Sequence, residues 1–324
     1  LRESQMKKVF ALSVVIIFLS FTPVQAQENF NIEQVAIHDY EWTEISEIVP
    51  HGEFAVVNTH KSGLSFWDIS DPENVSEFAF YELPDLYRDI IVRGDFAYVI
   101  SAGFKIYNIS NPNEVEFVGE YDDVVERGQG WSERYVAVRE NIAVVTGIDG
   151  THIINISDLR NPRRLSCIEG RGYKPEIYGD YVIYYSTDPS GLSIFDISNP
   201  ESPDLVNFIE NLPNRRFKVH NDELFLTVDN IVQIYSLLDP TNLEILDEIR
   251  FDRNIYDMYF EGEMAFFRGR DGYLSILDIA DVDRFEFVRD YDFQLPLRKI
   301  SKQGDLLFFA NDSRGLTIMD ASNL

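Results

Sequence analysis

Hydrophobic and polar residues alternate along most of the chain, in short segments rich in β-branched and aromatic residues. Residues 52–57, 63–72 and 75–80 show the arrangement: two alternating segments joined by a loop, then an Asp-Pro pair, then a third segment. A period of two predicts β-strands, and the Asp-Pro pair predicts a tight turn. Helical periodicity is absent outside residues 6–26, which excludes helical solenoids. We therefore expect an all-β fold.

The same arrangement occurs seven times, about 42 residues apart, which is the period of a propeller blade. The copies begin at Gly52, Gly94, Asn141, Gly179, Asn221, Gly262 and Gly304. In each copy a fourth, more polar segment, such as 88–93, leads to the next copy. Four antiparallel strands per repeat are typical of propellers. The sequence thus predicts a seven-bladed β-propeller of four-stranded antiparallel blades.

The two ends of the chain predict how the ring closes. The last copy stops at 321–324, after its second strand, and two further strand-like segments, 32–37 and 43–49, precede the first copy. Placing both segments in the last blade would leave no open sheet edge, which is the usual hazard of β architecture. We therefore expect a ring closed by N-terminal strands.

The core of the repeat reads Gly-Leu-Ser-x-x-Asp-Ile-Ser-[Asp/Asn]-Pro at 63–72 and 191–200, with changes at 103–112. It resembles the repeat of the LVIVD family of secreted bacterial β-propeller proteins. The resemblance covers essentially all of the chain after residue 26, and the motif is degraded in the last three copies. It implies a propeller fold and export. It transfers no active-site residue, because that family has no general catalytic motif.

Residues 6–26 have the features of a secretory signal peptide. Lys7 and Lys8 precede an apolar run over 9–21, and Val24-Gln-Ala26 supplies small residues at a cleavage site. The apolar run is shorter than a membrane span requires. We expect cleavage after Ala26, a single propeller over 27–324 without a membrane span, and an exported protein, either periplasmic or extracellular.

Composition narrows the possible chemistry. The chain has 28 Lys+Arg against 55 Asp+Glu and a net charge of −27, which disfavours nucleic-acid binding. Its single cysteine, Cys167, excludes an internal disulfide and is expected to be a buried or half-buried structural thiol. His60 and His152 are expected to be exposed loop residues, and motifs of known enzyme classes are absent. We expect no catalytic residue, metal or cofactor to be identifiable, although an enzyme stays open.

Basic residues recur where the innermost strands begin, a position that should ring one mouth of the central channel. The candidate ligand-binding residues are Arg88, Arg134, Lys174, Arg215, Arg216, Arg298 and Lys299, with Trp131 from the longest connection. Guanidinium groups beside aromatic rings suit the capture of a carboxylate or phosphate. The alternative is structural, since interleaved acids such as Glu47, Asp89 and Asp257 could pair with these bases and hold adjacent blades together.

Two function classes follow. The first is a non-enzymatic binding or scaffold propeller, presenting a loop face and an Arg-lined channel mouth to a protein segment or an anionic ligand. Its partner would be a cell-envelope or extracellular protein, an anionic small molecule or an oligosaccharide, and we expect a monomer. The alternative is an exported hydrolase or lyase acting on an acidic polysaccharide, with His60, His152 or a tyrosine as base.

Overall fold

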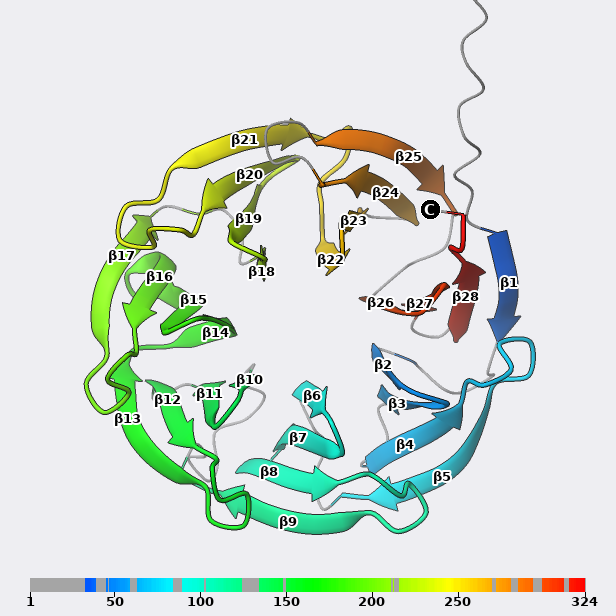
Figure 1. Cartoon of the computed structure of the whole chain (residues 1–324), viewed down its shortest axis with the longest axis horizontal. Coiled ribbons are helices and arrows are strands. Elements are labelled where there is room, and N and C mark those ends of the chain that lie inside the picture. The colour runs from blue at the N-terminus through cyan, green and yellow to red at the C-terminus, as the bar shows by residue number, and fades with distance from the viewer. Residues whose placement is uncertain are drawn as a thin grey trace, which may run out of the picture.

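The structure, a computed structural model, describes 33–38, 45, 47–58, 63–83, 89–101, 103–123, 134–147, 150–210, 212, 216–269, 272–280, 285–293, 299–311 and 315–323. These residues form 28 strands in seven four-stranded antiparallel sheets, arranged as blades around a central axis (Figure 1). The predicted seven-bladed β-propeller is thus confirmed. These ranges contain no helix that is long and apolar enough to cross a membrane. The predicted signal peptide, 6–26, lies outside them.

Six blades run from the axis outward in chain order, and the seventh does so except for its outermost strand. The innermost strands are β2 (Glu47–His51), β6 (Asp89–Arg93), β10 (Tyr135–Arg139), β14 (Gly172–Tyr178), β18 (Phe217–His220), β22 (Asp257–Glu261) and β26 (Lys299–Gln303). The second strands are β3 (Phe54–Asn58), β7 (Phe96–Ser101), β11 (Ile142–Thr146), β15 (Tyr181–Thr187), β19 (Glu223–Val228), β23 (Met264–Arg268) and β27 (Leu306–Ala310).

The two outer layers complete the blades. The third strands are β4 (Gly63–Asp68), β8 (Gly103–Asn108), β12 (Gly150–Asn155), β16 (Ser190–Asp196), β20 (Ile231–Ser236), β24 (Tyr273–Asp278) and β28 (Leu316–Asp320). The outermost strands are β5 (Ser76–Glu82), β9 (Glu116–Tyr121), β13 (Arg163–Glu169), β17 (Asp204–Glu210), β21 (Ile245–Arg250), β25 (Glu286–Asp292) and β1 (Glu33–His38). We number the blades 1 to 7 from the one that begins with β2.

The N-terminal strand β1 closes the ring. It pairs antiparallel with β28 as the outermost strand of blade 7, so that no blade is left with three strands among the described residues. The expectation that both N-terminal segments join this blade is wrong for the second one. Residues 47–51 form β2, the innermost strand of blade 1. The error arose because the repeats were counted from the Gly turn, whereas each blade begins one strand earlier.

The turns after the third strands share one hydrogen bond. The side-chain oxygen of the last strand residue accepts the backbone N–H two residues on, at distances from 2.7 to 3.3 Å, in all seven blades as described, at Asp68, Asn108, Asn155, Asp196, Ser236, Asp278 and Asp320. This is the turn hydrogen bonding expected from an Asp/Asn exchange at a repeated position.

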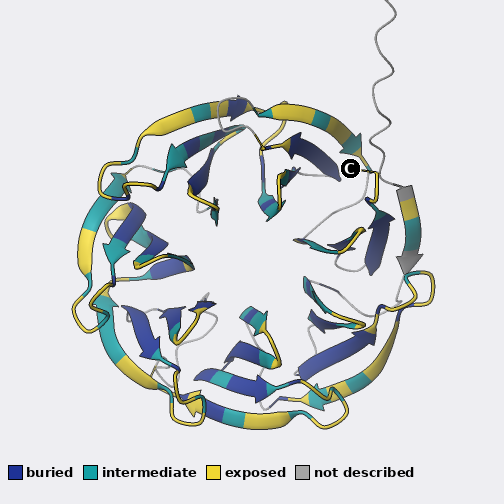
Figure 2. Cartoon of the chain, viewed as in Figure 1, coloured by how far each residue is buried: buried dark blue, intermediate teal, exposed yellow. Residues whose placement is uncertain are grey.

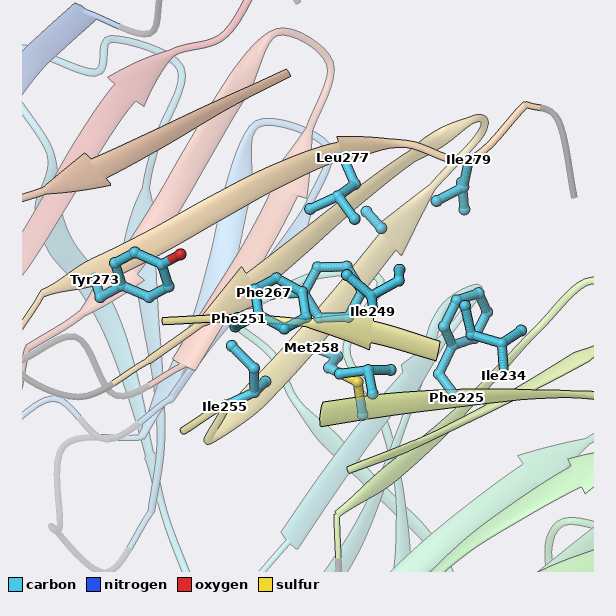
Figure 3. Close-up of a cluster of buried hydrophobic side chains, with 12 residues drawn as sticks. Phe225, Ile234, Ile249, Phe251, Ile255, Met258, Phe267, Tyr273, Leu277 and Ile279 are labelled. Atoms are coloured by element: carbon cyan, nitrogen blue, oxygen red, sulfur yellow. The ribbon is translucent and has the colours of Figure 1, made fainter. Parts of the chain in front are cut away.

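The hydrophobic core lies between the blades. Second and third strands are largely buried and outermost strands largely exposed (Figure 2). Among the described residues, seven apolar clusters form, one at each junction of adjacent blades. In Figure 3, Phe225 and Ile234 of blade 5 meet Phe267 and Leu277 of blade 6. Each blade therefore depends on both of its neighbours, and the ring holds the innermost strands in place around the axis.

Candidate functional site

A cavity of about 590 Å³ lies on the axis and is walled by the innermost strands of all seven blades. Residues at or near the starts of these strands contribute one side chain each: Glu47, Asp89, Tyr135, Lys174, Arg216, Asp257 and Lys299. These are the repeat positions that the sequence placed at the channel, and the structure brings them together there. Charged side chains of both signs therefore share one enclosed space.

Ion pairs link adjacent blades within this wall. Lys299 of blade 7 bonds Glu47 of blade 1, and the Lys218 Nζ of blade 5 lies 2.6 Å from the Glu176 Oε1 of blade 4. The Glu176 carboxylate raises the pKa of Lys218. For Lys299, burial opposes the charge, but the carboxylates of Glu47 and Asp89 outweigh it and raise the pKa. Lys218 and Lys299 thus form ion pairs that link adjacent blades. This is the structural role that the sequence analysis gave as the alternative to ligand binding.

Asp89 occupies an unusual position for a carboxylate. Its Oδ2 accepts the backbone N–H of Val136 at 2.9 Å, across the junction of blades 2 and 3. Burial raises the pKa of Asp89 to about 6, and the nearby Glu47 charge adds to this, against the opposing effect of Lys299. The side chain therefore changes charge in the mildly acidic range.

Lys174 is presented by an irregular segment of β14. Of the innermost strand pairs described, only β14–β15 shifts register, between Tyr173 and Glu176. Lys174 lies in this bulge with φ = 46° and precedes Pro175, although neither a left-handed φ nor a following proline suits a lysine. Bulges redirect side chains, and strained backbone of this kind clusters at binding sites. The Lys174 side chain is exposed to the cavity.

Arg216 lies next to this lysine in the ring and is held by its surroundings. Its guanidinium carbon lies 4.4 Å from the centre of the Tyr256 ring of blade 6, a cation–π distance. Its carbonyl oxygen accepts the backbone N–H and the hydroxyl of Thr227, each at 3.1 Å. The guanidinium is thereby fixed in the cavity wall before any ligand arrives.

The predicted site residues are thus only partly brought together. Lys174, Arg216 and Lys299 line the cavity, whereas Arg134 is 8% exposed and is not among its lining residues. The remaining candidates lie outside the described residues: Arg88, Trp131, Arg215 and Arg298. Sequence reasoning missed the Lys218–Glu176 pair and the special presentation of Lys174. The Lys-Pro sequence inside an innermost strand was the available signal.

His152 corrects another expectation. It lies in β12, not in a loop, and is fully buried, with its Nδ1 3.3 Å from the Tyr121 hydroxyl of the neighbouring blade. The strand begins earlier in the sequence than expected, at Gly150, and therefore includes His152. Cys167, opposite His152 in the sheet register, is half-buried as expected. His60 lies outside the described residues. No group of three or more His, Cys, Asp or Glu within the described ranges could hold a metal ion.

Comparisons with known proteins agree with this fold. The LVIVD repeat family model matches residues 87–123 and 176–209, so the chain contains LVIVD repeats, in blades 2 and 4. No curated protein matches the chain.

Solved propellers share the architecture at low identity. The computationally designed Ika8 protein is 10% identical, with a TM-score of 0.63 over 89% of this chain and 99% of its own. The Cps50 (Swd1) β-propeller domain of Myceliophteria thermophila is 12% identical, with a TM-score of 0.67 over 90% and 99%. BamB from Moraxella catarrhalis is 16% identical, with a TM-score of 0.54 over 89% and 97%. Such identities show the fold alone.

Proposed function

We propose that this protein is an exported, non-enzymatic binding or scaffold propeller that takes an anionic ligand, or an anionic group of a protein segment, into its channel. One observation supports this most: the cavity wall carries five Lys and Arg against four Asp and Glu, in a chain whose net charge is −27. The channel is thus locally balanced or cationic within an acidic protein. A negatively charged group is therefore repelled less in the channel than at the acidic outer surface, and the lysines and arginines of the wall can attract it.

The architecture suits binding without chemistry. The cavity wall consists mainly of residues of the innermost strands, which the apolar clusters between the blades hold in place. The site is therefore preorganised, and little binding free energy is spent on ordering it when a ligand binds. Of the bases considered for the hydrolase or lyase alternative, His152 is buried in β12 away from the cavity lining. Tyrosines do line the cavity, but the Arg216 guanidinium covers the ring of one of them, Tyr256. We therefore favour the binding role.

The cellular setting belongs to the same proposal. The signal-like segment over 6–26 supports export to the periplasm or the extracellular space, where a monomeric propeller would meet cell-envelope or extracellular proteins, anionic small molecules or oligosaccharides. The high net negative charge would also keep the exported protein in solution, because like-charged molecules repel one another.

A thermal-shift screen tests the binding role. The purified protein is melted with acidic oligosaccharides, small carboxylates, phosphate and a hexaglutamate peptide, each at two salt concentrations. A ligand at about 100 times its Kd stabilises the folded state by about 2.7 kcal/mol, so binding raises the Tm visibly. The shift should shrink in Arg216→Gln and persist in Arg250→Gln, which removes the same charge from the exposed outermost strand of the same blade. No shift with any compound would contradict the proposal.

A further inference from the structure

Lys174 lines the cavity on the axis, among charged side chains from several blades. Its charge interacts with side chains of four other blades, namely Asp89, Lys218, Asp257 and Lys299 of blades 2, 5, 6 and 7. The left-handed bulge at Lys174 interrupts the regular alternation of β14, and bulges of this kind redirect side chains.

Lys174 and Asp257 are two charged groups of the wall that stay available to a ligand; Arg93, at the last position of β6, is a third. Neither Lys174 nor Asp257 makes a hydrogen bond or ion pair with another residue in the part of the chain that the structure describes. Lys218 and Lys299, in contrast, are engaged by Glu176 and Glu47. A cation and a carboxylate thus face one cavity from blades 4 and 6, close enough to influence each other and not joined.

The charge around these two groups disfavours a polyanion. Asp89 and Glu47 line the same cavity as Asp257, so a chain of negative groups threaded through it would meet carboxylates on blades 1, 2 and 6. The net charge of −27 would also repel a multiply charged anion at long range, whereas a ligand without net charge is not repelled. The arrangement matches one negative group beside one positive group.

Resting on the proposed binding role, we infer that the channel takes a compact zwitterion of the amino-acid type. Its carboxylate binds Lys174 with Arg216 beside it, and its ammonium binds Asp257. Tyr135 and Tyr256 line the same cavity and add aromatic surface to its wall. A free amino acid and the end of a peptide share this chemistry, and the size of the cavity, about 590 Å³, suits either.

Calorimetric titration of the purified protein separates the charge classes. The probes are 6-aminohexanoate, hexanoate, hexylamine and adipate, which have equal chain length, with glycine and 4-aminobutanoate to vary the separation of the charges. We expect at least one amino acid to bind about tenfold more tightly than hexanoate and adipate, because it satisfies both charged groups. Glycylglycine, compared with glycine, distinguishes a peptide end from a free amino acid.

Three variants assign the groups. Lys174→Gln should weaken the best amino acid and hexanoate alike, by about tenfold. Asp257→Asn should abolish the advantage of the amino acid over hexanoate, and Arg250→Gln should change neither. If Lys174→Gln lowers the Tm, Lys174→Gly provides a second test, because glycine fits the left-handed backbone and should keep the fold while losing the ligand.

The outcomes distinguish this inference from the proposed function. Tighter binding of adipate or hexaglutamate than of every amino acid would overturn the zwitterion and leave the anion-binding role standing. Equal affinities in Asp257→Asn and the unchanged protein would also overturn it. No binding by any probe would overturn both.

Discussion

The Lys299 ammonium of blade 7 bonds the Glu47 carboxylate of blade 1, where the last blade of the chain meets the first. In the same blade 7, β1 pairs with β28 as the outermost strand, and the chain then continues into blade 1. The first and last parts of the chain are thus held together by an ion pair at the inner wall and by strand pairing at the rim of blade 7. Between the two lies an apolar cluster that contains Trp67 and Phe308.

Replacing Lys299 by methionine should lower the free energy of unfolding by about 1–2 kcal/mol, because it leaves the largely buried Glu47 without its partner. The effect is smaller than for a fully buried pair, since the Lys299 side chain is 45% exposed. Urea denaturation measures it. Adding Glu47→Gln should recover part of the loss, and Arg160→Gln, at an exposed pair, should change stability by less than about 0.5 kcal/mol. A Lys299→Met variant as stable as the parent would show that the junction does not need the charge.

Deleting the chain through residue 38 should destabilise the ring and promote association. The deletion removes β1 and exposes the backbone of β28 as an open edge, which can pair with another chain. Light scattering after size exclusion and thermal melting measure both effects. A deletion that ends at residue 32 keeps β1 and serves as the control. An unchanged monomer with an unchanged Tm would show that closure by β1 contributes nothing.

Asp89→Asn should stabilise the protein at neutral pH and have little effect near pH 4. The folded pKa of Asp89, about 6, lies above the ordinary value of 3.8, so the folded state holds this proton more tightly than the unfolded state does. The parent therefore loses stability as pH rises from about 4 to 6, and the amide, which can still accept the Val136 N–H, does not. The difference should reach at most about 3 kcal/mol above pH 7.

Urea midpoints between pH 4 and pH 8 measure this difference. A variant less stable than the parent at pH 7.5 would mean that the Asp89 charge stabilises the ring, contrary to the burial argument.

Lys174→Gly should raise the free energy of unfolding by about 1 kcal/mol, because a lysine at φ = 46° adopts a left-handed conformation that costs L-residues about 1–2 kcal/mol. Ligand binding should be lost at the same time. The structure therefore predicts a gain of stability at the expense of function, which chemical denaturation and calorimetry together detect.

Glu140→Gly is the matched control. Glu140 has φ = 51° in the hairpin between β10 and β11, where five other blades have glycine, and it lies outside the cavity lining. It should gain similar stability and keep the ligand. If both variants lost binding, rigidity rather than the Lys174 ammonium would explain the effect.

The repeat pattern predicted the fold because each blade follows the same local rules. Alternating strands, a turn bonded through residues such as Asp68, and a positive φ at Gly52 or Gly94 are all properties of short segments. The ring position of Lys174, Arg216 and Lys299 followed from the same count. How these side chains pair did not, because Lys299 meets Glu47 only once the ring has closed.

The errors have a similar origin. Alternation alone does not show that β12 begins at Gly150, so it predicts a loop for His152, which in fact packs against Tyr121 of the preceding blade. Lys174 lies in a bulge, which a period of two does not reveal. Contacts between blades, rather than within them, decide both cases.

One measurement tests the channel site most directly. Crystals of the protein soaked with 4-iodophenylalanine, a zwitterion with an anomalous scatterer, locate the ligand without assumption. We predict an iodine peak inside the channel, with the carboxylate at Lys174 and the ammonium at Asp257. Iodine only on the outer strands, with an empty channel at the same concentration, would contradict the site proposed for this propeller.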